Sequence, residues 1–446
     1  MNEQGSLSRR AFIKTAGAAA LAAGAGVQVV GAGRAHAKPK TLKILQWHHF
    51  VPAFDEWFNN TYVKAWGEQN DTHVIVDNVG MTSLPSRAQA EVSARKGHDL
   101  FMFLRPPPVY EDHVIDHREI YEECKFRYGQ AIDLAKKSTY NPKTQKFYGF
   151  SDSYVPDPIN YRKDLWDDVG LFPDTWDHIR VGGRKIKQKH GIPVGIGLAP
   201  ELDTNMALRS IMAAFGASVQ DRHSQPALKT RQALEALKFV KALYQEAMTD
   251  EVFTWDASSN NRLMLAGRGS LTLNAISITR TGENQKIPMA DRIWLAKAAG
   301  GPAGRIGFEH LMDVYVIWKF AENIDGAKQF LVDYVGHFRQ AFLASQFYNF
   351  PCFPTTVADL KDLIANDPNA TPRDKYAIFA DVSDWMTNVG YPGYANAAID
   401  EIFSSWRIST MFAQAASGKL TPEEALSRAD QDVKRIFDQW RDRGKV

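Results

Sequence analysis

His113 and His117 stand four residues apart, a spacing that places two imidazoles on one face of a helix and could hold a metal ion. Their neighbours are acidic: Glu111, Asp112, Asp116 and Glu119. Such a polar environment is more typical of a solvated helix surface than of a metal site. We therefore expect the two histidines to be surface residues and expect no metal.

Motifs that support catalysis at a fixed spacing are missing from the chain. The sequence has no G-x-S-x-G nucleophile elbow, no P-loop, no H-E-x-x-H and no C-x-x-C pair. No cofactor is expected. A role in binding is favoured over catalysis, and an exported enzyme is the lesser alternative.

The first 37 residues resemble an export signal. Paired arginines, Arg9 and Arg10, precede Phe12, a mildly apolar stretch from Ala16 to Gly33, and a small-x-small site at 35–37. This pattern predicts a twin-arginine signal and a periplasmic location. A membrane anchor is less favoured, because the apolar stretch is short and rich in alanine and glycine.

Removing residues 1–37 would take away four basic side chains and one acidic one, so the remaining chain is close to neutral. Nucleic acids and anionic membranes require clustered lysine and arginine, and we expect neither as a partner. Two cysteines, Cys124 and Cys352, are too few for a disulfide framework. Separate buried thiols are favoured, although a bridge between them stays open.

The order of elements predicts an α/β fold. Strand patterns at 42–47, 73–76 and 99–104 alternate with helical stripes at 54–66 and 84–95. This opening predicts a doubly wound lobe, whose ligands collect at the carboxyl ends of the strands. The alternation resumes after Tyr148, which predicts a second lobe. Helices are expected at 233–244 and, after a capping box at Thr421–Glu424, as far as Trp440.

Four segments, in order along the chain, resemble the family 1 extracellular solute-binding proteins, which include maltose-binding protein. The resemblance extends over nearly the whole chain after residue 37. The segments are 146–150 (KFYGF) with 159–165 (INYRKDL), 173–177 (PDTWD), 266–270 (AGRGS) and 416–426 (ASGKLTPEEAL).

This resemblance implies a periplasmic binding protein-like fold with two doubly wound α/β lobes, a hinge between them and a ligand cleft. Lobe 1 would comprise residues 38–152 and 312–366, and lobe 2 residues 153–311 and 367–446. Closing about the hinge would bury the solute.

Positions that contact ligands in the family follow the first and third strands. Trp47, His48 and His49 occupy the first, although Trp47 could be core and the histidines could cap the next turn. Phe103 and Arg105 lie at the end of the third strand, where prolines replace an acidic residue of maltose-binding protein. A solvated charge is the alternative for Arg105.

The hinge strand and the following loop supply further candidates by resemblance. Asp152 and Tyr154 face the cleft in relatives, with hinge packing as the alternative. Glu201 and Asp203 precede a helix, and Asp203 could simply be its N-cap.

Later candidates are Asn274, Glu309, His310, Tyr391 and Tyr394. The tryptophan that relatives carry just after the position of Asn274 is absent, which removes one platform for stacking a sugar ring. A small sugar or polyol is therefore favoured over a long oligosaccharide.

The resemblance implies a monomeric receptor that delivers a carbohydrate to the permease subunits of an ABC importer. Aromatic rings stack on the C–H faces of a sugar, and polar side chains satisfy its hydroxyls. The alternative is the same receptor fold carrying a polyamine, an oxyanion or a metal chelate.

Overall fold

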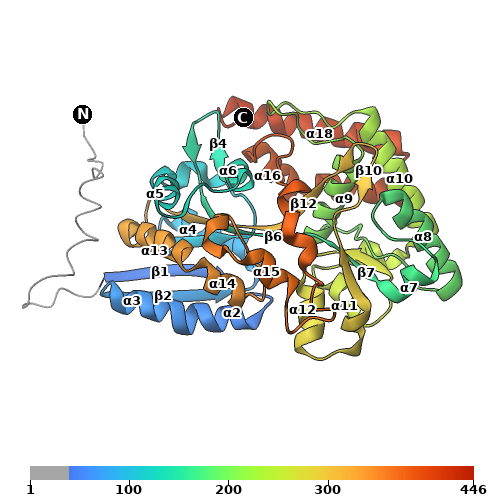
Figure 1. The fold of residues 1–446 in the computed structure, drawn as a ribbon. Helices are drawn as coiled ribbons and strands as arrows, with labels where there is room; N and C mark the ends of the chain where they lie inside the picture. Colours follow the sequence, from blue (N-terminus) through green and yellow to red (C-terminus); the bar gives the residue numbers. More distant parts are fainter. Residues whose placement is uncertain (1–39) are drawn as a thin grey trace, which may run out of the picture. The chain divides into compact units, whose positions relative to one another are not determined.

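The computed structural model describes residues 40–446, so the predicted export signal at 1–37 lies outside the described residues. Within this range the α/β order expected from the sequence is confirmed (Figure 1). None of the helices described here is long and apolar enough to cross a membrane.

The largest sheet is mixed and has seven strands. The first strand, β1 (Lys40–Trp47), is parallel to its neighbours β2 (Thr72–Val79) and β3 (Leu100–Phe103). β12 (Gly307–Ile317) continues the sheet antiparallel to β3 and β6 (Phe150–Pro156). In spatial order the strands are β13 (Phe350–Pro351), β6, β12, β3, β1 and β2, with β14 (Met386–Thr387) beside the start of β12.

An aromatic stripe anchors the first crossover helix to this sheet. Buried rings recur every fourth residue from Phe54 to Trp66, along α2 (Pro52–Trp57), a π-helical turn and α3 (Val63–Gln69). They pack on α13 (Ile324–Gly336), with the ring of Trp66 centred 5.2 Å from that of Phe330. Because α13 is more than 250 residues later in the sequence, this contact joins two distant segments of the chain in one core.

The second sheet is smaller and antiparallel. β7 (Ile159–Arg162) lies between β8 (Leu271–Leu273) and β9 (Ile293–Ala296) and pairs with both. Five helices share one hydrophobic core with this sheet: α8 (Trp176–His190), α9 (Leu202–Ala214), α10 (Arg231–Ala247), α17 (Arg407–Ala416) and α18 (Pro422–Asp442). The expected capping box is present, since the Thr421 hydroxyl and the Glu424 carboxylate each accept the other's backbone N–H.

Further helices and two hairpins complete the fold. The helices are α4 (Leu84–Ala94), α5 (Arg118–Tyr128), α6 (Asp133–Thr139), α7 (Lys163–Asp168), α11 (Ser259–Leu265), α12 (Ser277–Asn284), α14 (Phe338–Ala344), α15 (Leu360–Ala365) and α16 (Ala397–Ser404). Two hairpins pair β4 (Tyr140–Asn141) with β5 (Lys146–Phe147) and β10 (Gly300–Gly301) with β11 (Gly304–Arg305).

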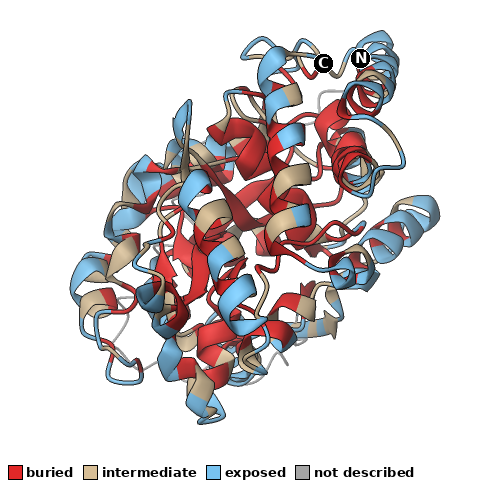
Figure 2. Cartoon of the chain, turned by 90° about the vertical axis from the view of Figure 1, so that its right-hand side faces the viewer, coloured by how far each residue is buried: buried red, intermediate tan, exposed pale blue. Residues whose placement is uncertain are grey.

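Two hydrophobic cores form around the two sheets. Most of the first comes from residues 42–155 and 311–385, and most of the second from residues 159–273 and 389–437. Buried residues follow the strands and the inner faces of the helices, as Figure 2 shows. The chain passes between the cores at the β6–β7 connection, at β12 and near residue 388.

Cys124 and Cys352 are both buried free thiols, which confirms the favoured of the two sequence-based alternatives. Cys124 lies on α5, and Cys352 follows β13. The Cys352 thiol lies 3.4 Å from the Ser151 hydroxyl. Both residues act as small core side chains, and the fold has no crosslink between them.

Replacing Gly390 by alanine should destabilise the protein by about 2 kcal/mol or more, because a new Cβ would overlap the backbone of Tyr394 and Ala395. Gly80→Ala is the control, since a Cβ there has nothing within 4 Å. Urea unfolding of both variants measures the difference. Equal stability of the two variants would contradict the tight packing of this loop.

Candidate functional site

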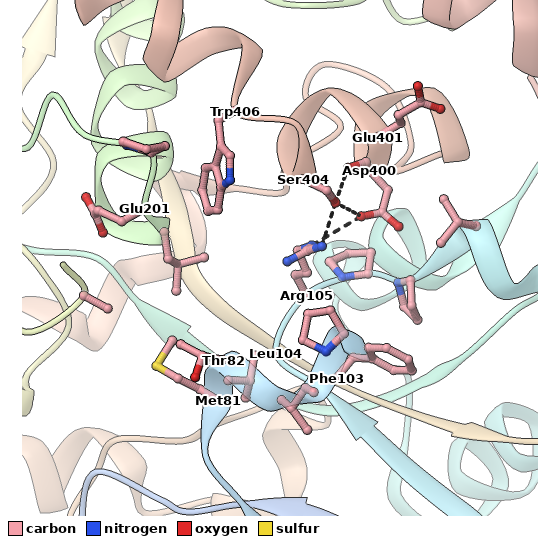
Figure 3. A pocket seen from close by; sticks show the side chains of 18 of the residues that line it. Met81, Thr82, Phe103, Leu104, Arg105, Glu201, Asp400, Glu401, Ser404 and Trp406 are labelled. Atoms are coloured by element: carbon pink, nitrogen blue, oxygen red, sulfur yellow. Dashed lines mark hydrogen bonds and ion pairs between the residues drawn. The ribbon is translucent and has the colours of Figure 1, made fainter. Parts of the chain in front are cut away.

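A cavity of about 760 Å³ lies between the two cores (Figure 3). The first-core side is lined by Met81, Thr82, Leu84, Pro85, Gln89, 103–107, Val109 and Tyr110. The second-core side is lined by residues 200–202, 255–257, Asp400, Glu401, Ser404 and Trp406. The walls therefore come from the carboxyl end of β3, the start of α4, and the termini of α9, α16 and α17.

Two tryptophans line this cavity on the second-core side. Trp255 is largely buried, and its indole N–H has no protein partner. Trp406 precedes α17 with a left-handed backbone, at φ 57°. A large side chain rarely adopts this conformation, which costs about 1–2 kcal/mol and is often found at ligand sites. With this backbone conformation the indole lies at the cavity wall (Figure 3).

Carboxylates outnumber cations on the cavity wall. Glu201, Asp256, Asp400 and Glu401 line it, with Arg105 as the one basic side chain among the described lining residues. Several of these charges are already paired. Arg105 contacts Asp400 at 3.3 Å, Asp256 contacts Arg262 at 3.0 Å, and Glu401 accepts the Trp440 indole N–H at 2.6 Å.

Glu201 forms no ion pair within residues 40–446 and caps a helix instead. Its two oxygens accept the backbone N–H groups of Asp203, at 2.7 Å, and Thr204, at 2.5 Å. Burial, together with the nearby Asp203 charge, raises the pKa of Glu201 to about 8. Glu201 is thus the N-cap of α9, and the alternative reading of Asp203 as this N-cap is wrong, because the helix begins at Leu202.

Asp203 turns inward and joins a buried cluster with His310. The imidazole lies 3.2 Å from the Asp157 carboxylate and 3.6 Å from that of Asp203. Burial disfavours a charged imidazole, but the two carboxylates outweigh it and raise the pKa of His310. Asp203 also accepts the Asn260 amide at 2.5 Å, and burial raises its pKa to about 6. The cluster joins the crossing strands to α9 behind the cavity wall.

Asp152 and Tyr154, predicted for the cleft, are buried in the central sheet. The Ser153 hydroxyl lies between the Asp152 carboxylate, at 2.7 Å, and the Asp313 carboxylate, at 2.9 Å. Burial raises the pKa of Asp152 to about 7 and that of Asp313 above its ordinary value. Tyr154 packs on Phe350, with ring centres 5.8 Å apart. None of these side chains lines the cavity.

The three candidates at the end of β1, residues 47–49, are also separate from the cavity. Trp47 is buried in the first core, and His49 is buried between Asn349, at 3.1 Å, and the backbone of Val51. Burial lowers the pKa of His49 to about 4, so its imidazole is neutral. His48 is exposed beside Asp55. This arrangement is the one expected if Trp47 is core and a histidine caps the next turn.

The late candidates have partners of their own. Asn274 donates to Asn261 at 2.6 Å, and buried Glu309 accepts the backbone N–H of Val389 at 3.1 Å. Tyr391 packs on Phe308 and Tyr394 on Tyr140. Of all the site residues expected from the sequence, the cavity thus brings together Phe103, Arg105 and Glu201.

Sequence reasoning missed most of the cavity wall. The missed residues that could contact a solute include Met81, Thr82, Trp255, Asp256, Asp400 and Trp406. Two of them are tryptophans, so the tryptophan absent after Asn274 is no measure of how many stacking platforms the protein has. Trp406 carries a weak signal in the sequence, as an aromatic residue a short distance before the last family-like segment at 416–426.

The fold and cavity define a two-cored α/β binding protein. Residues 52–345 match the family of bacterial extracellular solute-binding proteins. The chain belongs to this family.

Individual relatives are more distant. A binding protein of Brucella abortus is 24% identical over 186 residues, which are 41% of this chain and 45% of that protein, so the match spans less than half of the relative. A solute-binding protein of Thermotoga lettingae, solved with α-D-tagatose, superposes with a TM-score of 0.72 at 20% identity, covering 89% of this chain and all of that one. A sugar transporter of Arthrobacter chlorophenolicus, solved with laminaribiose, gives 0.73 at 14% identity and covers 89% and 99%.

Glu309→Gln should flatten the pH dependence of stability. Burial raises the pKa of Glu309 to about 8, so this group stabilises the fold below its ordinary pKa, and the contribution is lost as pH rises toward 8. The wild type should lose a few kcal/mol through this group between about pH 5 and about pH 8, and the glutamine variant should not. Urea unfolding across this range tests it; parallel profiles for the two proteins would contradict it.

Proposed function

We propose that this protein is an extracytoplasmic receptor that binds a small carbohydrate or polyol and delivers it to the permease of an ABC importer. The observation that carries the proposal is the cavity between the two cores, with Trp255 and Trp406 beside several hydrogen-bonding side chains. Membership of the solute-binding family supports it. So do structural neighbours solved with tagatose and with laminaribiose.

The cavity suits the two chemically different surfaces of a sugar. Indole rings can stack on the C–H faces, while Thr82, Gln89 and Glu201 can exchange hydrogen bonds with hydroxyls. A volume of about 760 Å³ falls within the range of small-molecule sites and exceeds the needs of one monosaccharide. A mono- or disaccharide is therefore the proposed class of ligand.

The proposed mechanism is binding without chemistry. Residues 38–152 and 312–366 would move as one lobe, and residues 153–311 and 367–446 as the other. Two separate cores support two lobes, and the chain crosses between them near 157, within β12 and near 388. The boundary at 366/367 lacks this support, because Tyr376, Phe379 and Trp385 pack in the first core. Closing the lobes over the solute would present a new surface to the permease.

The proposal also includes the location of the protein in the cell and its oligomeric state. We propose export by the twin-arginine route, on the pattern at Arg9 and Arg10, and action as a periplasmic monomer. No cofactor is proposed, because the described cavity residues can bind a polyhydroxy solute without one.

A cationic solute, such as a polyamine, is the second candidate. The excess of carboxylates on the cavity wall favours it, since Glu201, Asp256, Asp400 and Glu401 face one arginine. Aromatic rings also attract organic cations. The pairing of Asp256, Asp400 and Glu401 within the protein weakens this case, and the carbohydrate stays the first candidate.

A thermal-shift screen against sugars, polyols and polyamines tests both candidates. A solute that binds only the folded state at a hundredfold excess over Kd stabilises it by about 2.7 kcal/mol. We expect a clear rise in Tm with at least one mono- or disaccharide. A rise with spermidine or putrescine and with no carbohydrate would replace the first candidate by the second.

Trp406→Ala should remove most of the shift that a sugar produces, lowering affinity by about tenfold or more through loss of stacking. Trp294→Ala is the matched control, because this half-buried indole lies on β9 and not in the cavity wall. Titration calorimetry with the sugar found in the screen measures both. Equal affinity of the Trp406 variant and the wild type would place the sugar elsewhere.

A further inference from the structure

We propose that Arg105 sets solute affinity by holding the two lobes together across the cavity, and not by contacting the solute. The group formed by Arg105, Asp400 and Ser404 is called the latch below. The inference goes beyond the proposed function and rests on it only in that closure retains a solute.

The latch joins elements that belong to different cores. Arg105 follows β3 and is succeeded by three prolines, which restrict the backbone that carries it. Asp400 and Ser404 lie on α16, almost 300 residues later. The Arg105 Nε donates to Asp400 Oδ1 at 3.3 Å, and an Nη donates to Ser404 Oγ at 2.7 Å (Figure 3).

The flat face of the Arg105 guanidinium makes a second contact with α16 by stacking on an aromatic ring. Its central carbon lies 5.2 Å from the ring centre of Phe403, also on α16. The guanidinium of Arg209 lies 5.3 Å from the same ring centre, and Arg209 and Phe403 are buried. The Phe403 ring is thus held in place. Arg105 contacts α16 both through the N–H groups at the edge of its guanidinium and through the flat face of the guanidinium.

Because Asp400 is buried, its negative charge needs the compensating charge of Arg105. The side chain of Asp400 is 5% exposed and that of Arg105 is 28% exposed. Burial raises the pKa of Asp400 even though the Arg105 charge opposes it. Removing one partner of a buried pair leaves the other charge uncompensated, which costs more than the pair itself contributes.

The titratable and charged groups that face the latch are few. Those around Asp400 are Arg105, Tyr110 and Tyr148, with the Ser404 hydroxyl and the backbone N–H of Val109 as hydrogen-bond donors, and Arg209 lies across Phe403. No second cation among these groups contacts Asp400. Without Arg105, closing the lobes would bury an unpaired carboxylate.

A latch and a direct contact affect affinity in different ways. If a solute binds the closed form, its apparent Kd is the intrinsic Kd divided by the closed fraction. Loss of the latch lowers that fraction, so it weakens every solute by the same factor. Loss of a direct contact weakens different solutes by different factors.

The distance between the lobes tests the latch without any solute. Spin labels would be placed at Phe126→Cys on α5, where the side chain is 86% exposed, and at exposed Gln188→Cys on α8. The native thiols are buried and do not compete for the label. We expect Arg105→Ala to move most of the ligand-free population to longer distances than in wild type. An unchanged distance distribution would overturn the proposal.

A double-mutant cycle separates the latch from general loss of packing. Asp400→Asn removes the charge that Arg105 compensates, so adding Arg105→Ala in that background should change the closed fraction far less than it does alone. Arg105→Lys should restore part of the closed fraction. Independent, additive effects of the two substitutions would contradict a latch.

The pH profile is a readout that a purely structural role would not move. In Arg105→Ala the closed form buries an uncompensated carboxylate, so closing takes up a proton and lower pH favours closure. The closed fraction of this variant should rise several-fold between about pH 8 and about pH 5, with a smaller change in wild type. Equal slopes would contradict the role of Asp400.

Affinity completes the test. With α-D-tagatose and laminaribiose as probes, Arg105→Ala should raise both Kd values by one common factor, about tenfold for a half-buried ion pair. Different factors for the two sugars would make Arg105 a direct contact and overturn the proposal. Failure of the wild type to bind any carbohydrate would count against the proposed function, while the distance measurement still decides on the latch.

Discussion

All eleven residues of β12 are buried, and three of them, Glu309, His310 and Asp313, have ionisable side chains. A polar group inside a protein must find a partner or lose free energy. Glu309 therefore accepts a hydrogen bond from the backbone N–H of Val389, and Asp313 accepts one from the Ser153 hydroxyl. The His310 imidazole contacts the carboxylates of Asp157 and Asp203. These partners come from both cores, so the polar groups of this one strand fix where the crossing segments meet.

This constraint separates the residues of the hinge from those of the cavity. Asp152, Glu309 and His310 have the chemistry of ligand contacts, but each is buried with a partner inside the protein, and none of the three lines the cavity. The cavity wall is built instead from strand and helix ends, where a side chain such as Trp406 can face open space. Glu201 connects the two regions, since it lines the cavity and lies beside Asp203 of the buried cluster.

The sequence predicted the elements well where the signal is local. The alternation at 42–47 and the stripe from Phe54 to Trp66 follow from periodicity, and the capping box at Thr421 follows from hydrogen bonding within one turn. Few of the residues that line the cavity were predicted, because resemblance points to a strand end but not to the direction of each side chain. Phe103, Arg105 and Glu201 reach the cavity, while Trp47 and Tyr154 turn into the core.

The sequence by itself determined the order of strands and helices, the family to which the chain is similar, and the supply of aromatic and acidic side chains. Only the tertiary structure decided which of those side chains share a space. Arg105 and Asp400 are 295 residues apart, and neither has a local signal that names the other. Their pairing depends on how two cores pack across β12, because long-range contacts are set by the burial of whole elements and not by spacing along the chain.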